Sequence, residues 1–197
     1  MQYKWLPNLL SSSRILLTPV FLYYLFSDFS HGKLYALCVF SVASITDAYD
    51  GKIARKYNVE TKLGIFLDPL ADKFLVLSAF YGFMYLPILD TTIKLWMIIL
   101  ISFRDVIVTL LRTCMEYKGI TMITSKLGKT KTAMQLITIH TILLYLILIS
   151  YQIESSILSV NFLYFLMLIT TLITFYTGVH YVYFNYKTLG HFFSNKA

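Results

Sequence analysis

Four aspartates form the most chemically suggestive pattern in this sequence. Asp47 and Asp50 are spaced i, i+3, and Asp68 and Asp72 are spaced i, i+4. On helices, each spacing presents both carboxylates on one face. A loop near residues 52–62 would join the two helices. The helices can then be antiparallel neighbours, and the four carboxylates can converge.

Four converging carboxylates need cations, because they cannot all stay ionised together in a half-buried place. Mg²⁺ and Mn²⁺ prefer all-oxygen ligation and keep open positions for phosphate oxygens. The pattern therefore predicts a two-metal site that acts on a phosphate or diphosphate. In the alternative interpretation, the aspartates are solvated charges at helix ends, paired with the nearby cations Lys52, Arg55, Lys56, Lys62 and Lys73.

Small residues and one arginine lie between the two aspartate pairs. Gly51 follows the second aspartate, Ala54 and Arg55 come next, and Gly64 precedes the second pair. Glycine and alanine let a ligand or a neighbouring helix approach the backbone closely. The planar guanidinium of Arg55 is suited to a phosphate.

The composition excludes a soluble or disordered chain. Of the 197 residues, 57% are hydrophobic and only 14% are charged, whereas a soluble domain is about 45–50% apolar and about 25% charged. Two cysteines cannot form a disulfide framework, and we expect both to be small buried apolar residues. The net charge of +7 favours loops against anionic lipid over a nucleic-acid surface.

Apolar runs long enough to cross a hydrocarbon core predict the architecture. We expect an all-α, polytopic membrane protein that forms a single domain over residues 1–197. Because lipid leaves no backbone group cheaply unsatisfied, every run should be helical. The six predicted transmembrane helices lie near 8–27, 34–51, 65–86, 92–114, 132–151 and 155–186.

Charge placement predicts the orientation of these helices. With the N-terminus inside, the inner segments are the start of the chain, about 52–62, about 116–131 and the C-terminus. Of the 17 Lys and Arg residues, only Lys33 and Lys94 then fall on the outer side. This asymmetry is typical of positive-inside topology. The aspartates and both termini are therefore expected on the cytoplasmic side of a multi-pass cell-membrane protein.

The aspartate segment is similar to a family signature. From Asp47 to Asp72 the chain matches D-x2-D-G-x2-A-R-x8-G-x3-D-x3-D without a gap, and this pattern resembles that of the CDP-alcohol phosphotransferases. The resemblance implies a membrane enzyme with a six-helix core, usually a homodimer, whose site faces the cytoplasm, here of a bacterial inner membrane. Such an enzyme transfers a phosphatidyl or similar group from a CDP-linked lipid to an alcohol and releases CMP.

The resemblance also implies roles for individual residues. Asp47, Asp50 and Asp68 match metal ligands for two divalent ions, Mg²⁺ or Mn²⁺. Asp72 matches the proposed general base toward the acceptor hydroxyl and is also a candidate metal ligand. The positions that match the CDP-binding site are Asp47, Asp50, Gly51, Ala54, Arg55, Gly64 and, near the start of the chain, Asn8.

Three further segments resemble the branch of the family whose acceptor is glycerol 3-phosphate. They are Leu6–Leu10 with Arg14, Arg104–Arg112, and Ser125–Thr132. The family commonly has Arg-Glu where this chain has Arg104-Asp105, which shortens one carboxylate arm. The resemblance implies CDP-diacylglycerol and glycerol 3-phosphate as substrates, with membrane lipids as surroundings.

Cations after the signature support an anionic acceptor. Arg104 lies inside the fourth apolar run, where a charge is costly and usually functional. Arg112 follows near the same helix face. The candidate ligands for the acceptor phosphate are Arg104, Arg112, Lys126, Lys129 and Lys131. Two alternatives stay open: the lysines reflect topology and anionic lipid alone, or Arg104 pairs with Asp105 or with an acid on another helix.

Other functions remain as alternatives. Within the family these are a CDP-diacylglycerol-type cardiolipin synthase, a phosphatidylserine synthase and a phosphatidylinositol-phosphate synthase. A divalent-cation transporter is the alternative of a different class, because acidic residues in membrane helices also mark ion paths. The single histidines in the fifth and sixth runs, His140 and His180, are interpreted as hydrogen-bonded packing residues.

Overall fold

Helices and the short connections between them make up the described part of the chain. The computed structural model describes the backbone of residues 6–57, 62–117, 126–153, 157–186 and 188, and the side chains of residues 13–46, 73–115, 128–153, 157–186 and 188. No strand occurs in these ranges, which confirms the all-α fold class. The elements are α1 (Leu6–Phe26), α2 (Gly32–Tyr57), α3 (Lys62–Met84), the short 3-10 helix η1 (Pro87–Leu89), α4 (Leu95–Tyr117), α5 (Lys126–Ser150) and α6 (Val160–Phe184).

The helices coincide with the six apolar runs, with differences at their ends. The loop predicted near 52–62 is wrong, because α2 continues to Tyr57 and α3 begins at Lys62. Residues 52–57 include Lys, Ala and Arg, which are good helix formers, and contain no proline that would end the helix. α5 also begins earlier than predicted, at Lys126, several residues before the apolar run itself.

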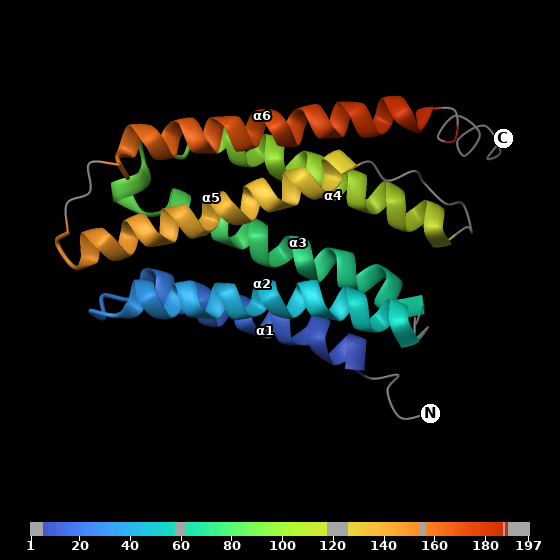
Figure 1. Cartoon of the computed structure of the whole chain (residues 1–197), viewed down its shortest axis with the longest axis horizontal. Coiled ribbons are helices and arrows are strands. Elements are labelled where there is room, and N and C mark those ends of the chain that lie inside the picture. The colour runs from blue at the N-terminus through green and yellow to red at the C-terminus, as the bar shows by residue number, and fades with distance from the viewer. Residues whose placement is uncertain (1–5, 58–61, 118–125, 154–156, 187, 189–197) are drawn as a thin grey trace.

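The six helices run up and down along one long axis (Figure 1). α1 packs against α2 and α3, α3 packs against α4, and α6 packs against both α4 and α5. α5 also packs against α2, and it contacts α3. The C-terminal end of α2 and the N-terminal ends of α3 and α5 lie at the same end of the bundle, as do the start of α1 and the end of α6 (Figure 1). We call this end the signature end.

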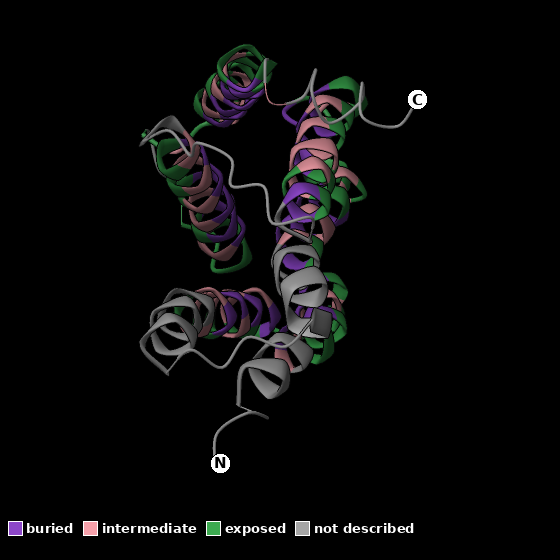
Figure 2. Ribbon diagram, turned by 90° about the vertical axis from the view of Figure 1, so that its right-hand side faces the viewer, coloured by how far each residue is buried: buried purple, intermediate pink, exposed green. Residues whose placement is uncertain are grey.

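Aromatic side chains fill the centre of the bundle. Phe21, Phe40, Phe80 and Phe83 are completely buried, and the rings of Phe21 and Phe40 lie 5.5 Å apart. Figure 2 shows the buried residues on the sides of the helices that face one another, with exposed residues on the outside. Interdigitated packing of this kind fixes the relative positions of the helices and therefore of the polar residues they carry.

The outer surface of the bundle is apolar. Leu16, Phe103 and Leu172 are among its exposed large side chains, which suits a surface that contacts lipid. The expectation that both cysteines are buried is wrong, because Cys38 and Cys114 are exposed. Each cysteine lies on an outward-facing side of its helix, where a small apolar side chain is compatible with lipid.

The apolar helices indicate a membrane protein. Within the described residues, Gly128–Ser150 and Val160–Phe184 are long and apolar enough, by length and composition, to cross a membrane. Shorter apolar stretches occupy Ser13–Phe26, Gly32–Thr46 and Lys73–Met84. The number of membrane crossings, predicted as six, stays a prediction.

Candidate functional site

The four aspartates of the signature lie on two helices that meet the same end of the bundle. Asp47 and Asp50 belong to the C-terminal part of α2, and Asp68 and Asp72 belong to the N-terminal part of α3. Figure 1 shows both helix ends at the signature end, and α1 packs against both helices. The backbone thus places both pairs toward one end of the bundle, and the convergence of the four carboxylates stays a prediction. Their side chains lie outside the described residues, so metal binding stays a prediction.

The other predicted nucleotide-binding residues occupy the same end by backbone position. Gly51, Ala54 and Arg55 lie in the last turns of α2, and Gly64 lies in the first turn of α3. Asn8 lies in the first turn of α1, whose start is also at the signature end (Figure 1). The side chains at these positions are outside the described residues.

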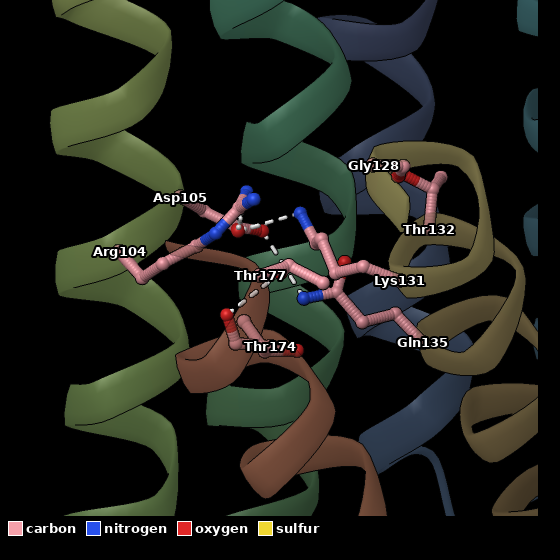
Figure 3. Close-up of polar contacts among 8 residues, drawn as sticks. All are labelled: Arg104, Asp105, Gly128, Lys131, Thr132, Gln135, Thr174 and Thr177. Carbon is pink, nitrogen blue, oxygen red and sulfur yellow. Dashed lines mark hydrogen bonds and ion pairs between the residues drawn. The ribbon is translucent and has the colours of Figure 1, made fainter. Parts of the chain in front are cut away.

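A buried cluster of charges lies between α4, α5 and α6 (Figure 3). Asp105 of α4 is completely buried and accepts hydrogen bonds from three side chains. Lys131 Nζ lies 2.5 Å from Asp105 Oδ1, Gln135 Nε2 lies 3.1 Å from Asp105 Oδ2, and Arg104 Nη1 lies 3.2 Å from Asp105 Oδ1. We call these four residues the Asp105 cluster.

Helix geometry explains how the Asp105 cluster assembles. Lys131 and Gln135 are four positions apart on α5, so they lie on one face and reach the same carboxylate. α4 and α5 each pack against α6, and the long side chains of Lys131 and Gln135 extend from α5 to α4 (Figure 3). Both cations thus pair with a carboxylate inside the bundle, where an isolated charge among apolar helices would be costly.

The Asp105 cluster carries a net charge and contains polar atoms without hydrogen-bond partners among the described residues. Two cations surround one carboxylate, which leaves a formal charge of +1. Among the described residues, Arg104 Nε and Gln135 Oε1 are buried without a hydrogen-bond partner. Because a buried polar atom without a partner is costly, such atoms are rare unless a ligand or water completes them. Arg104 Nε can therefore donate a hydrogen bond to an anionic ligand, and Gln135 Oε1 can accept one from a hydroxyl group.

The Asp105 cluster lies close to the helix that carries Asp72. Lys73, the residue after Asp72 on α3, is near enough to Lys131 to act on it electrostatically. α3 also contacts α4 and α5 directly. An acceptor held by Arg104 and Lys131 would therefore lie near the middle of α3, where Asp72 and Lys73 are.

The five predicted acceptor ligands divide into two groups. Arg104 and Lys131 are largely or completely buried and share Asp105. Arg112 of α4 and Lys129 of α5 are exposed, and the side chain of Lys126 lies outside the described residues. Arg104 pairs with Asp105, as one of the predicted alternatives has it. That contact leaves Arg104 Nε available among the described residues, so phosphate binding stays a prediction.

Sequence reasoning missed Gln135 and the polar face of α6. Thr170, Thr174 and Thr177 are buried, and Thr170 Oγ1 lies 2.6 Å from Thr138 Oγ1 of α5. The i, i+4 spacing of Lys131 and Gln135 was the available signal for Gln135. Threonines inside an apolar run give no such signal, because a hydroxyl can bond to its own helix.

The two histidines differ in whether their ring nitrogens have hydrogen-bond partners. His140 is the hydrogen-bonded packing residue that was predicted: Nδ1 lies 2.8 Å from the Leu136 carbonyl oxygen and Nε2 lies 3.1 Å from Ser41 Oγ. His180 stacks on the ring of Phe184 with 4.9 Å between centroids. Its Nδ1 has no hydrogen-bond partner among the described residues, so only the packing part of that prediction applies.

Comparison with known families identifies the class of protein. Residues 4–182 match the CDP-alcohol phosphatidyltransferase family. The match covers the signature helices, the Asp105 cluster and most of α6, and the chain belongs to this family.

Individual relatives are similar over most of their length. The chain is 36% identical over 152 residues, 71% of this chain and 77% of the relative, to the CDP-diacylglycerol–glycerol-3-phosphate 3-phosphatidyltransferase of Bacillus subtilis. It is 35% identical over 180 residues, 90% of this chain and 79% of the relative, to a probable phosphatidylglycerophosphate synthase of Mycobacterium tuberculosis. A Salmonella typhimurium protein with the same name as the Bacillus one is 32% identical over 145 residues, 71% of this chain and 76% of the relative.

Proposed function

We propose that this protein transfers the phosphatidyl group of CDP-diacylglycerol to sn-glycerol 3-phosphate, giving phosphatidylglycerophosphate and CMP. The names of its relatives support both substrates. The observation that carries the proposal is the Asp105 cluster, because it holds two cations near Lys73 of α3 and, among the described residues, a guanidinium nitrogen without a hydrogen-bond partner. An acceptor with a phosphate needs such a group, whereas a neutral alcohol does not.

Arg104 and Lys131 bind the acceptor phosphate in this proposal. Arg104 contributes a planar fork of donors and Lys131 a compact charge. The exposed Arg112 and Lys129, with Lys126, attract the anion to the signature end. Asp72 accepts the proton of the acceptor hydroxyl, whose oxygen forms the new bond to phosphorus as the bond from phosphorus to the CMP oxygen breaks.

The four aspartates fit two divalent metal ions by the chemistry of their donors. Asp47, Asp50, Asp68 and Asp72 are an all-carboxylate set on two helices whose ends lie at the signature end (Figure 1), and such a set suits Mg²⁺ or Mn²⁺. When bound, these ions would neutralise the diphosphate and stabilise the departing CMP. In the same proposal Gly51, Ala54, Arg55, Gly64 and Asn8 contact the cytidine nucleotide.

The proposed orientation places this chemistry at the cytoplasmic face. Six helices cross a bacterial inner membrane, and the signature end with both termini faces the cytoplasm. The position of the start of α1 and the end of α6 at one end of the bundle supports this topology (Figure 1). The proposal includes a homodimer, which the family resemblance implies.

An acceptor panel tests the proposed activity. Purified protein in CDP-diacylglycerol liposomes with Mg²⁺ is offered glycerol 3-phosphate, phosphatidylglycerol, serine and inositol phosphate in turn, and CMP and lipid product are measured. We expect product with glycerol 3-phosphate. Lipid product only with another acceptor would overturn the proposal in favour of a cardiolipin, phosphatidylserine or phosphatidylinositol-phosphate synthase.

A metal-transport assay separates the enzyme from the transporter alternative. Asp105, the carboxylate inside the bundle, is bonded to two cations and an amide, so it is not arranged as a metal ligand. Among the described residues no group of three or more His, Cys, Asp or Glu converges. We expect metal-dependent CMP release that Asp72→Asn abolishes. Metal uptake by liposomes without CMP release would contradict the proposal.

A further inference from the structure

The backbone of α6 meets the side chain of Arg104 at a glycine. Gly178 is buried, and a Cβ atom added to it would lie 2.6 Å from Arg104 Cγ, 3.5 Å from Arg104 Nε and 3.6 Å from Arg104 Cδ. The first distance is below any real carbon contact. The aliphatic stem of Arg104 therefore lies directly on α6 at the one position without a side chain.

This contact sets the direction in which the guanidinium points. Beyond the stem, Arg104 Nη1 reaches Asp105 Oδ1 at 3.2 Å, and Arg104 Nε remains unpaired among the described residues. Because Asp105 holds one end of the side chain and Gly178 supports its middle, Arg104 has little freedom to reorient. A methyl group at position 178 must push the stem away from α6 and carry Nε and Nη1 with it.

Small polar residues lie on α6 just before Gly178, and the buried Tyr181 lies one turn after it. Thr174 and Thr177 lie beside the Asp105 cluster (Figure 3), and both are buried. Thr177 Oγ1 donates a hydrogen bond to the Thr174 carbonyl oxygen at 2.9 Å, so it is directed back to its own helix.

We infer that Gly178 is a positioning residue for acceptor binding: it gives Arg104 the room to aim its guanidinium at the acceptor phosphate. The inference rests on the proposed function, and it adds the last helix to the acceptor site. Gly178 acts through Arg104 and does not touch the substrate.

Gly178→Ala tests the inference, with Gly82→Ala as a matched control. Gly82 is also a buried helical glycine, and a Cβ there would lie 2.9 Å from Leu25 Cδ2 and 3.0 Å from Leu22 Cδ2. These atoms are the ends of apolar side chains of α1. Alanine favours helix more than glycine in both cases, so a loss must come from the contact made by the new methyl group.

Steady-state kinetics of CMP release give the expected result. Gly178→Ala should raise KM for glycerol 3-phosphate about tenfold, the size of one weakened charge-assisted hydrogen bond, and leave KM for CDP-diacylglycerol unchanged. Gly82→Ala should change neither constant. An unchanged KM for glycerol 3-phosphate in Gly178→Ala, or an equal rise of both constants, would overturn the inference.

A double variant covers the case in which Gly178→Ala does not fold. Arg104→Ala removes the atoms that the new methyl group would meet, so Gly178→Ala combined with Arg104→Ala should melt in detergent like Arg104→Ala alone. A double variant that unfolds like Gly178→Ala would show that the clash is not with Arg104 and would refute the inference. A wild-type protein that releases no CMP with glycerol 3-phosphate would instead refute the proposed function.

Discussion

Helix α5 makes two polar contacts with neighbouring helices, and they differ in how many of their polar atoms have hydrogen-bond partners. Toward α2, His140 uses both ring nitrogens, one on Ser41 Oγ and one on the Leu136 carbonyl oxygen. Toward α4, Lys131 and Gln135 meet Asp105, and polar atoms of the cluster remain unpaired among the described residues. We call the first contact closed, because both ring nitrogens have partners, and the second open, because it holds two cations and one carboxylate and has polar atoms without partners among the described residues.

The difference separates packing from function. A closed contact satisfies polar groups that would otherwise be costly among apolar helices, and it holds two helices together. An open contact keeps buried donors and a positive charge that packing alone does not need. For polar residues inside the bundle, the number of polar atoms still without hydrogen-bond partners therefore separates a ligand-binding role from a packing role. The degree of burial alone does not separate the two roles. Four substitutions test this comparison, from the largest effect to the smallest.

Asp105→Asn should have the largest effect. The substitution leaves two buried cations without a balancing carboxylate, and breaking a buried ion pair in this way costs about 3–5 kcal/mol. We expect a lower melting temperature in detergent and loss of CMP release dependent on glycerol 3-phosphate. Asp105→Glu keeps the charge and is the matched control, which should retain activity. Equal losses in the two variants would contradict the role of the charge.

Lys131→Met should weaken acceptor binding more than it weakens the fold. Asp105 keeps its hydrogen bonds from Arg104 and Gln135, and methionine fills the space of the lysine stem. KM for glycerol 3-phosphate should rise by about tenfold or more, as expected for a lost hydrogen bond to a charged group. The exposed Lys129 provides the comparison, since Lys129→Met should have a smaller effect. A larger effect at Lys129 would place the acceptor outside the Asp105 cluster.

Gln135→Leu should have an intermediate effect. It removes one hydrogen bond to Asp105 Oδ2, and a hydrogen bond to a charged group contributes about 1.5–3 kcal/mol. We expect a modest loss of stability and a rise in KM for glycerol 3-phosphate, because the carboxylate is held less firmly. A stability change alone, with both Michaelis constants intact, would show that Gln135 is only a packing residue.

Ser41→Ala should have the smallest effect. It removes the contact with His140 Nε2, and hydrogen bonds between membrane helices contribute on average about 0.6 kcal/mol. Detergent melting should fall slightly while the kinetic constants stay unchanged. A change in KM for glycerol 3-phosphate as large as that of Gln135→Leu would remove the distinction between the two contacts.

The fold and part of the site could be predicted from the sequence. Apolar runs located all six helices because each run has the length of a membrane-crossing helix. The predicted loop near 52–62 failed, since charged residues there continue α2 to Tyr57. The positions of the aspartates followed from local spacing, which needs no knowledge of packing.

The partners across helices could not be predicted. Arg104 was singled out because a charge inside an apolar run is visible in the sequence. Its contact with Gly178 depends on how α4 and α6 approach each other, and a single glycine within an apolar run does not indicate which helix it faces. Gln135 was missed for the same reason, because its partner Asp105 lies on another helix.

The most direct test of the account is acceptor selectivity at Arg104. CMP release is measured with glycerol 3-phosphate and with unphosphorylated glycerol, for the wild type and for Arg104→Leu. The account predicts that the wild type strongly prefers the phosphorylated acceptor and that Arg104→Leu loses most of this preference. A variant that keeps the full preference for glycerol 3-phosphate would contradict the claim that the Asp105 cluster recognises the acceptor phosphate.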